Sequence, residues 1–446
     1  MPFVATSIDL PPHTAEVRAA DLDGDGRKEL IFVSSEPKGR QPDAVTLTLV
    51  SLTAEGQPTK RETLRLGQRA TLWDAHNGLW GVDGDGAYNL RTAARLGARR
   101  TALGGLGLTT PLAADLASDI DGDGVAEIVV VGGGKVELFS ADGRSRGAVP
   151  VRSEGSLKAN ARGGGLQVAA AAAWPGMTFG DWDGDGIDEL LLPDGDTLEV
   201  VRFGPAGATA TKVKLPRDVE PRRDPAADPK AGRRDIENVW LKDVNNDGKV
   251  DLVVHQWVIG STFFGATAEL ITARGNGTGF DKPTTIATSA AAVDVQLRDI
   301  DNDGDLDILA SQVDLSISNI GRALVSRKVQ VDLCAYIWGS GGYASQAKVI
   351  RRTGFSISEP ERLKLKVEAD LNGDGWIDLV TNDGGDQLVA FAGGPAGISE
   401  APLATWPGAL PLGPDPLFIE ELTGDARAEV LLWGPKATKA TLLRLR

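Results

Sequence analysis

DWDGDGIDE, at residues 181–189, is the stretch that decides the fold of this chain, because the same nine-residue pattern occurs six times. An acid or Asn stands at positions 1, 3, 5 and 9, Gly always stands at position 6, and an apolar run follows. The other copies are DLDGDGRKE at 21–29, DIDGDGVAE at 119–127, DVNNDGKVD at 243–251, DIDNDGDLD at 299–307 and DLNGDGWID at 370–378. A pattern repeated this often predicts a repeat protein.

The spacing of the oxygen-bearing side chains predicts that the pattern is a calcium loop. Calcium binds about six to eight oxygen atoms at about 2.3–2.6 Å, and short acidic side chains at alternate positions of a tight loop can all turn toward one ion. Position 7 would contribute its backbone carbonyl, which explains why its side chain varies, and Gly at position 6 allows a tight bend. The predicted ligands are Asp21, Asp23, Asp25, Arg27, Glu29, Asp119, Asp121, Asp123, Val125, Glu127, Asp181, Asp183, Asp185, Ile187, Glu189, Asp243, Asn245, Asp247, Lys249, Asp251, Asp299, Asp301, Asp303, Asp305, Asp307, Asp370, Asn372, Asp374, Trp376 and Asp378.

Three other kinds of calcium loop do not fit. An EF-hand needs a Glu at position 12 between two helices, and position 12 here holds no acid in any copy. Thrombospondin-type calcium repeats carry many disulfides, whereas this chain has a single cysteine, Cys334. Repeats-in-toxin nonapeptides follow one another without a gap, whereas tens of residues separate these loops.

The residues around each loop predict strands. Alternating polar and apolar residues lead into a loop, as in VQLRD at 295–299, and a short apolar run leaves it, as in DILAS at 307–311. This pattern is typical of a strand, a loop and a buried strand. A further strand pair with a Gly-rich turn follows, such as LITARGNGTGF at 270–280. Four strands per unit predict the blade of a β-propeller.

On these motifs the whole chain resembles the FG-GAP/VCBS repeat family, the calcium-bearing β-propellers of integrin α-subunit heads, some fungal lectins and many bacterial surface proteins. The resemblance implies that each metal lies in the hairpin between the first and second strands of a blade, on one face. It also implies that partners bind the opposite face, formed by the second-to-third-strand and inter-blade loops. The motifs are specific for fold and metal but not for a ligand.

The number of units predicts an all-β, eight-bladed propeller. GVDGDGAYN at 81–89 resembles a seventh calcium loop, but it has Gly at position 1 and Asn at position 9. We therefore expect it to join the second and third strands of a blade whose degenerate calcium loop is TLWDAHNG at 71–78. ELTGDARAE at 421–429 is a last degenerate copy. We expect both degenerate loops to bind metal weakly or not at all.

The chain ends are expected to meet in one blade. After the last loop only two strands remain, and the N-terminal FVATSIDL at 3–10 could supply the missing outer strand. Such pairing would close the ring and hide both sheet edges. A seven-bladed ring with an irregular segment around 60–115 is the alternative. In both cases residues 1–446 form a single domain, with LPRDVEPRRDPAADPKAGRRD at 215–235 as a long exposed loop.

Charge and calcium affinity limit the place and partners of the protein. A net charge of −15 argues against a nucleic-acid partner, and no apolar run approaches the ~20 residues of a membrane span. Extracellular calcium modules bind with dissociation constants on the order of 0.1–1 mM, so resting cytosol would leave about six structural sites empty. We therefore expect a secreted, periplasmic or cell-surface protein. Since Met1–Phe3 shows no signal-peptide pattern, any signal or lipid anchor is expected to be absent from this chain.

Aromatic residues are the candidate ligand-binding groups. His255, Trp257, Phe263 and Phe264 lie in HQWVIGSTFFG, which we expect between the second and third strands of a blade. Flat rings stack on sugars and anchor peptides, although packing between blades is an alternative. The resulting hypothesis is a non-catalytic adhesion or lectin-like module that binds a glycan or an extracellular protein. A lyase-like enzyme acting on polysaccharides and a scaffold of a surface assembly are the alternatives.

Overall fold

The protein is described by a computed structural model. The structure describes residues 2–446 except 36–43, 69–70, 76–77, 84–85, 91–94, 97–116, 121, 123–126, 133–134, 141–144, 152–153, 163–164, 174–176, 205–206, 217–232, 260–265, 340, 357–364, 383–386, 396, 409, 412–416 and 435.

The described residues form eight antiparallel sheets of four strands each, and seven of these sheets follow chain order from their first strand to their fourth. The first four consist of β2 (Thr14–Ala20), β3 (Glu29–Ser35), β4 (Ala44–Leu52) and β5 (Pro58–Gln68); β6 (Thr71–Ala75), β7 (Gly78–Asp83), β8 (Gly86–Asn89) and β9 (Arg95–Leu96); β10 (Ala117–Ser118), β11 (Glu127–Gly132), β12 (Lys135–Phe139) and β13 (Ser145–Pro150); and β16 (Thr178–Gly180), β17 (Glu189–Asp194), β18 (Thr197–Gly204) and β19 (Gly207–Lys214).

The other four sheets have the same antiparallel order, and the last of them takes its fourth strand from the N-terminus. They consist of β20 (Arg233–Lys242), β21 (Asp251–Ile259), β22 (Thr267–Ala273) and β23 (Thr284–Ala287); β24 (Ala291–Arg298), β25 (Asp307–Val313), β26 (Lys328–Tyr336) and β29 (Lys348–Ser356); β30 (Leu365–Ala369), β31 (Asp378–Thr381), β32 (Leu388–Phe391) and β33 (Ala404–Trp406); and β34 (Leu417–Glu421), β35 (Ala428–Leu432), β36 (Lys439–Leu445) and β1 (Phe3–Asp9).

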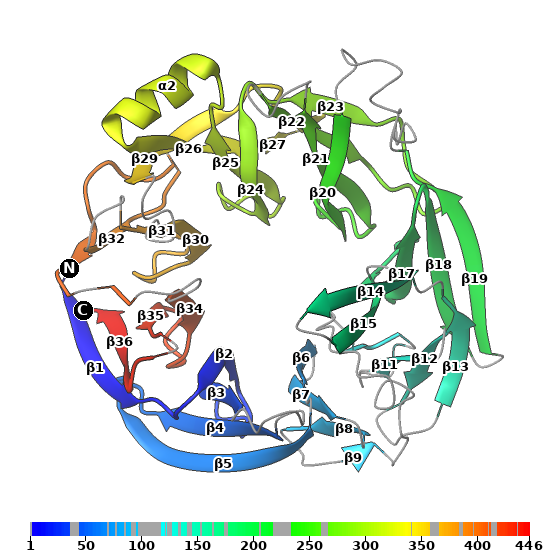
Figure 1. Ribbon diagram of the computed structural model, residues 1–446, viewed down its shortest axis with the longest axis horizontal. Coiled ribbons are helices and arrows are strands. Elements are labelled where there is room, and N and C mark those ends of the chain that lie inside the picture. Colours follow the sequence, from blue (N-terminus) through cyan, green and yellow to red (C-terminus); the bar gives the residue numbers. More distant parts are fainter. Residues whose placement is uncertain are drawn as a thin grey trace.

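The sheets follow one another around a circle, with their first strands toward the centre (Figure 1). The two chain ends lie side by side, and β1 pairs antiparallel with β36, from Phe3 opposite Leu445 to Asp9 opposite Lys439. The expected all-β class and the expected pairing of the N-terminal strand with the last sheet are both observed. The stretch 81–89 also has its predicted place, because it spans the turn between β7 and β8, the second and third strands of their sheet.

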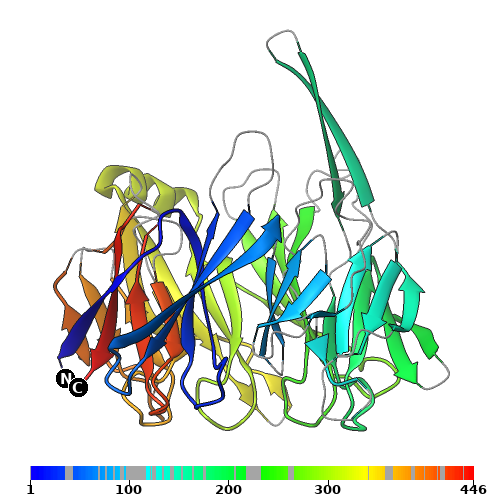
Figure 2. The same ribbon diagram turned by 90° about the horizontal axis from the view of Figure 1, so that it is seen from below.

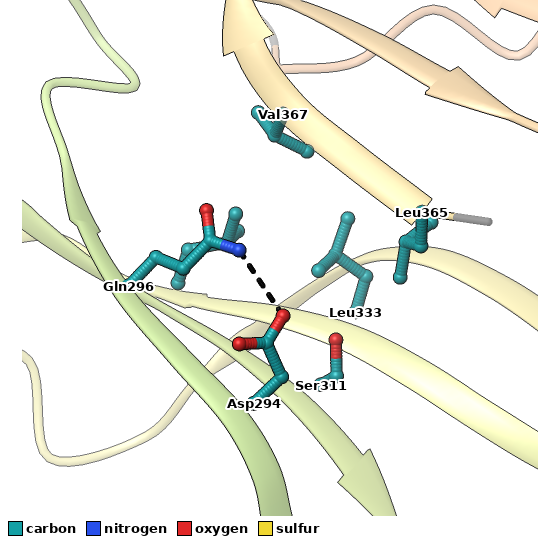
Figure 3. Close-up of a pocket in the computed structure, with 7 residues that line it drawn as sticks. Asp294, Gln296, Ser311, Leu333, Leu365 and Val367 are labelled. Carbon is teal, nitrogen blue, oxygen red and sulfur yellow. Dashed lines mark hydrogen bonds between the residues drawn. The ribbon is translucent and has the colours of Figure 1, made fainter. Parts of the chain in front are cut away.

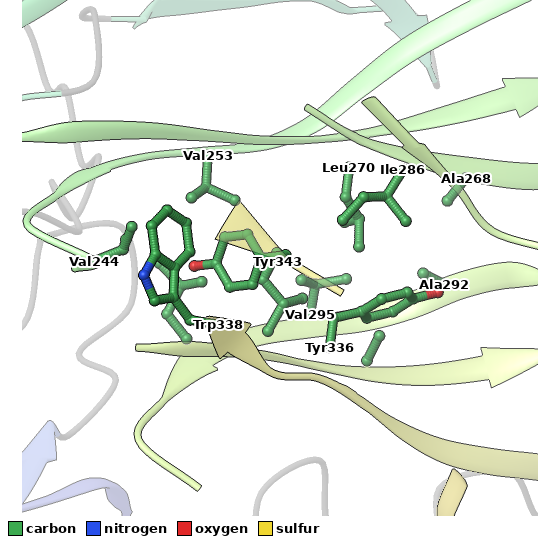
Figure 4. Close-up of a cluster of buried hydrophobic side chains, with 13 residues drawn as sticks. Val244, Val253, Ala268, Leu270, Ile286, Ala292, Val295, Tyr336, Trp338 and Tyr343 are labelled. Carbon is green, nitrogen blue, oxygen red and sulfur yellow. The ribbon is translucent and has the colours of Figure 1, made fainter. Parts of the chain in front are cut away.

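The hydrophobic core lies between neighbouring sheets. In one cluster, Val253 and Leu270 of one sheet pack against Val295 of the next and against Trp338 (Figure 4). Trp338 and Tyr343 meet edge to face there, with ring centroids 4.7 Å apart. Because both faces of an inner strand are covered by neighbouring sheets, β25 is buried at all seven positions. Burial of this apolar surface is the main force that holds the sheets together.

The contact between the last sheet and the first, here called the seam, has a core of its own. Ile8 of β1 clusters with Leu30 and Phe32 of the first sheet and with Leu431 and Leu442 of the last. Sequence segments that are more than 400 residues apart therefore share one hydrophobic cluster. The seam depends on β1, which belongs to the last sheet and leads directly into the first.

Two elements that sequence reasoning did not predict extend the end of the molecule opposite the acidic loops (Figure 2). The hairpin of β14 (Glu154–Arg162) and β15 (Gly165–Ala173) projects far beyond the sheets. Helix α2 (Ile317–Ser326) connects β25 to β26; Ser316 caps its first turn and Arg327 ends it in the left-handed conformation. Besides these elements, β27 (Trp338–Gly339) pairs antiparallel with β28 (Gly342–Tyr343) in a short ladder.

Replacing Ile8 by Ala should destabilise the seam. Ile8 is 2% exposed, and loss of a buried Ile side chain lowers the free energy of unfolding by about 2–5 kcal/mol. Ser7→Ala is the matched control, because Ser7 is exposed and surface changes usually stay within about 0.5 kcal/mol. Chemical denaturation measures both variants. Equal stabilities for the two variants would contradict the role given to β1.

Candidate metal centres

The six acidic loops have the predicted place, since each joins the first and second strands of a sheet. In loop 181–189 the carboxylate of Asp181 accepts hydrogen bonds from the amides of Gly184 and Gly186, both at 2.7 Å. Asp185 accepts from the amide of Ile187 at 2.9 Å, and Glu189 accepts from the amide of Trp182 at 2.8 Å. The acids at positions 1, 5 and 9 therefore fold the backbone of their own loop.

A second loop position needs a left-handed backbone, besides position 6. In loop 181–189, φ is 80° at Gly184 in position 4 and 88° at Gly186 in position 6. Position 4 is Asn246 in one loop and Asn302 in another, with φ of 52° and 57°. Gly and Asn tolerate this conformation best. The signal is present in the sequence, where position 4 is Gly or Asn in all six copies.

Carboxylate oxygens gather in three of the described loops. One oxygen from each of three acids lies within 4.8 Å of the others in the groups Asp21, Asp23 and Glu29; Asp181, Asp183 and Glu189; and Asp299, Asp301 and Asp303. Oxygen-only donor sets of this kind suit a hard divalent cation such as calcium. In two further loops, 243–251 and 370–378, an Asn at position 3 replaces one acid.

Two buried oxygens at position 3 fit the same interpretation. Oδ1 of Asp183 and Oδ1 of Asp301 are buried and have no hydrogen-bond partner. Burial raises the pKa of Asp301, and the neighbouring carboxylates of Asp303 and Asp299 raise it further. A buried carboxylate oxygen without a donor is costly, and a cation held by the loop would supply the missing partner. The donor set therefore fits calcium.

The acid at position 9 ties the loop to the third strand of its sheet or to the backbone two residues beyond the end of that strand. When that acid is Asp, its second oxygen accepts from a backbone amide: Asp251 from Gly275 at 2.7 Å, and Asp307 from Trp338 at 2.7 Å. Asp378 makes the same contact with Gly393 at 2.8 Å. These bonds hold all three carboxylates in the interior of their sheets.

At Glu29 and Glu189, a side chain from the third strand is the partner instead. The side chain of Ser51 on β4 hydrogen-bonds Glu29. Arg202 on β18 approaches Glu189 at 2.9 Å and also contacts Asp183. The longer Glu side chain thus reaches a side chain across the sheet, whereas Asp is held by the backbone.

Neighbouring loops are hydrogen-bonded to one another. The amide of Val250 in one loop donates to the carbonyl of Asp181 in the preceding loop at 3.0 Å, and the amide of Leu306 donates to the carbonyl of Val244 at 2.7 Å. The amide of Lys28 in the first loop donates to the carbonyl of Leu422 in the last at 3.1 Å. Position 8 of one loop therefore binds position 1 or 2 of the loop before it, so the loops support each other along one end of the molecule.

Some predicted residues lie outside the described residues. These are Asp121, Asp123 and Val125 of loop 119–127, and the aromatic residues Phe263 and Phe264.

The predicted exposed loop 215–235 is shorter than expected at both ends. Leu215 is fully buried, and Arg233 to Asp235 belong to β20, where Arg233 pairs with Ile259 of β21. The prediction was wrong at these boundaries because β20 and β21 are both longer than their apolar runs suggested. Residues 217–232 lie outside the described part of the chain.

His255 and Trp257 lie on β21 and not in the predicted loop after it. His255 is 1% exposed, and burial lowers its pKa, which favours the neutral imidazole. The expectation of a loop position was wrong because β21 continues to Ile259 and pairs with both neighbours over this length. Trp257 is half-buried on the same strand, and its part in ligand binding stays a prediction.

Among the described residues, three cavities between neighbouring sheets stand out. The smallest, about 10 Å³, is lined by Asp294, Gln296 and Ser311 among others (Figure 3), and it holds no more than a water molecule. A cavity of about 420 Å³ adjoins loop 181–189 and is lined by Arg146, Arg202 and Phe203, besides four acids. A third, of about 250 Å³, is lined by residues that include Arg274, Lys282 and Trp338.

Replacing Asp183 and Asp185 together by Ala should remove one bound calcium ion and lower the Tm in calcium. The two substitutions delete the acids at positions 3 and 5, one of which carries an unpartnered oxygen. Bound calcium is counted by equilibrium dialysis, and the Tm is measured in the same buffer. Asp9→Ala, at an exposed acid outside the loops, is the control. Unchanged stoichiometry would show that loop 181–189 is not a metal site.

Lowering the pH should stabilise the protein in excess chelator. Burial raises the pKa of Asp251, Asp307 and Asp378 from 3.8 to about 6. These acids bind protons more readily when folded than when unfolded, so the free energy of unfolding rises as the pH falls from about 7 through 6 toward 4. Thermal unfolding at a series of pH values checks this. A Tm that falls steadily over that range would contradict it.

A family model matches two stretches of the chain that contain acidic loops. The sequence profile of the FG-GAP-like repeat matches residues 119–192 and 243–310, and no curated protein matches the chain. Among solved structures, a Photorhabdus luminescens Tc holotoxin pore is similar over 96% of this chain and 27% of its own, with 13% identity and a TM-score of 0.24.

A mutant of the NanB sialidase from Streptococcus pneumoniae is similar over 83% of this chain and 66% of its own, with 10% identity and a TM-score of 0.26. This chain thus spans about a quarter of the length of the toxin chain. The two stretches matched by the repeat profile contain the loops 119–127, 181–189, 243–251 and 299–307. These two stretches of the chain therefore match the FG-GAP-like repeat.

Proposed function

We propose that this chain is an eight-bladed β-propeller, stabilised by calcium, that works outside the cell as a recognition module. Eight four-stranded sheets among the described residues and the pairing of β1 with β36 support the blade number and a ring closed by the N-terminal strand. Each sheet would then be one blade, and the two sheets that meet at the seam would be neighbours like any other pair.

The proposal that the loops bind calcium rests on the carboxylate oxygens at position 3 that have no hydrogen-bond partner. Asp183 and Asp301 occupy the same position in two different loops, and both leave a buried Oδ1 without a donor. The acids at positions 1, 3, 5 and 9 and the carbonyl at position 7 would hold the ion. When bound, calcium would neutralise the repulsion among these acids, so that its binding free energy adds to the stability of the fold. Six intact loops correspond to about six ions.

The low calcium affinity expected of such loops supports a place outside the cytosol. Sites with dissociation constants on the order of 0.1–1 mM fill at extracellular calcium levels. The described residues include no helix that could span a membrane. A secreted, periplasmic or cell-surface protein would keep its loops loaded.

The end opposite the loops is the proposed recognition surface. The loop end repeats one structure around the ring, whereas the opposite end carries α2 and the projecting hairpin of β14 and β15 (Figure 2). On α2, the apolar side chains of Ile317, Leu324 and Val325 are 77%, 68% and 88% exposed. Exposed apolar groups of this size are typical of protein contacts. We therefore favour a protein partner over a glycan.

Screening the calcium-loaded protein against a glycan array and against candidate surface proteins tests this function, with a chelated sample alongside. We expect a protein partner whose binding is weakened at least tenfold in the double variant Leu324→Ser, Val325→Ser and unchanged in Val293→Ser, which alters an exposed residue on another element. A calcium-dependent glycan whose binding is lost in Trp257→Ala would instead establish a lectin. Turnover of an acidic polysaccharide would show instead that the protein is an enzyme, and the protein-binding and lectin hypotheses would both fail.

A further inference from the structure

We propose that Arg444 is the resident cation of the degenerate loop 421–429, so that this loop holds the seam without a metal ion. The inference rests on the proposed binding of calcium by the intact loops, because it assigns to an arginine the place that an ion has in them. It concerns the loop of the last sheet, where the two ends of the chain meet.

The guanidinium of Arg444 lies among the oxygens that would surround an ion in an intact loop. Its Nε donates to Oε1 of Glu429 at 2.9 Å, and one terminal nitrogen donates to Oδ2 of Asp425 at 3.0 Å and to the hydroxyl of Thr423 at 3.3 Å. These partners stand at positions 9, 5 and 3 of the loop. The side chain of Arg444 is 18% exposed and that of Glu429 is 1% exposed. The charge is therefore largely withdrawn from water and paired with acids.

The loop has lost features that calcium binding requires. Thr423 replaces the acid or Asn at position 3, and its hydroxyl donates to Oε1 of Glu429 at 2.9 Å. The amide of Leu422 donates to Oε2 of Glu429 at 2.9 Å. Both oxygens of Glu429 thus have donors. Position 3, where Asp183 and Asp301 of the intact loops each leave a buried oxygen without a partner, is occupied here by a hydroxyl that itself donates. Ala426 stands where every intact loop has Gly, although its φ is 64°.

The strand register explains how Arg444 reaches the loop. Val430 of β35 pairs with Leu443 of β36. Arg444, the residue after Leu443, therefore lies opposite Glu429, the residue before Val430. The equivalent place opposite Glu29 in the first sheet holds Ser51, as Leu30 pairs with Val50. A serine hydroxyl can bond the Glu and leaves room for an ion. An arginine at the same place fills that room with its own positive charge.

Arg202 shows that an arginine opposite the Glu at loop position 9 does not by itself exclude a metal ion from the loop. It lies opposite Glu189 and contacts Glu189 and Asp183. Yet its side chain is 48% exposed, and its loop keeps all four acids together with Gly186. Oδ1 of Asp183 also stays without a partner beside it. Arg202 is therefore a matched comparison, an arginine that can turn outward when an ion binds.

Arg444 also contacts the first sheet across the seam. A Cβ atom on Gly56 would lie 2.8 Å from Cδ of Arg444, so the turn between β4 and β5 packs closely against the arginine stem. Two further contacts join the same sheets: the amide of Lys28 to the carbonyl of Leu422 at 3.1 Å, and Nζ of Lys28 to Glu420 at 2.6 Å. At the seam, charged side chains of the protein therefore take the place that a calcium ion would have near other pairs of neighbouring sheets.

Thermal unfolding of Arg444→Met in excess chelator and in saturating calcium tests the proposal. We expect the Tm to fall by a similar amount in both conditions, about 2–4 °C or more, because no ion replaces the guanidinium. Arg202→Met should lose stability in chelator only, since calcium neutralises its intact loop. If saturating calcium restores the Tm of Arg444→Met as well, or if this variant binds one more ion than the unaltered protein, the proposal is overturned.

Asp425→Asn provides a second test if Arg444→Met does not fold. The number of bound calcium ions should equal that of the unaltered protein, whereas a loss of one ion would overturn the proposal by showing that the loop holds calcium. Failure of the role proposed for Arg444 can be distinguished from failure of the proposed function. If the unaltered protein binds no calcium at all, the function proposed above fails, while a lower Tm of Arg444→Met in chelator still supports the role of the arginine.

Discussion

The buried carboxylate at the ninth loop position is the contact on which each sheet depends. It stands at the start of the second strand and accepts the amide of loop position 2, just after the first strand ends, as Asp251 does from Val244 at 3.2 Å. Its other oxygen accepts a backbone amide just beyond the third strand when the residue is Asp. In Glu29, Glu189 and Glu429 it meets a Ser or Arg side chain on the third strand instead. One acid therefore joins three strands, which explains why the pattern ends in an acid directly before an apolar run.

This contact places charge in the interior of the protein, and the rest of the loop compensates for it. Burial raises the pKa of the ninth-position acids, as at Asp378 and Glu429, so the ionised form needs nearby donors or cations. Backbone amides supply part of this compensation, and the proposed calcium ions would supply more. In the last sheet Arg444 contributes a positive charge from the chain itself. The loops thus all bury an acid at position 9, and they differ in the donors or cations that stabilise its charge.

The two ends of the molecule differ in structure as a consequence. Hydrogen bonds from loop to loop make the acidic end a repeated structure, in which a change at one loop affects its neighbour. The opposite end is free of this constraint, because the connections between second and third strands and between sheets only need to span short distances. Helix α2 and the hairpin of β14 and β15 are additions at such connections. Function specific to this chain is therefore expected where the structure departs from the repeat.

The sequence alone determined the fold class, the acidic loops and their place between the first and second strands. It could do so because these features depend on local spacing: two-residue alternation for strands, and alternate acids with Gly for the loop. The same local signals correctly placed 81–89 as a turn between a second and a third strand, despite its resemblance to a calcium loop.

Only the tertiary structure decided the contacts that depend on strand register and strand length. Arg444 meets Glu429 because β36 pairs with β35 in one particular register, and nothing in the spacing of 15 residues between them reveals this. His255 is buried because β21 extends beyond its apolar run and is covered by neighbouring strands. Register and burial are set by packing between segments that are distant in the chain, so local patterns do not contain them.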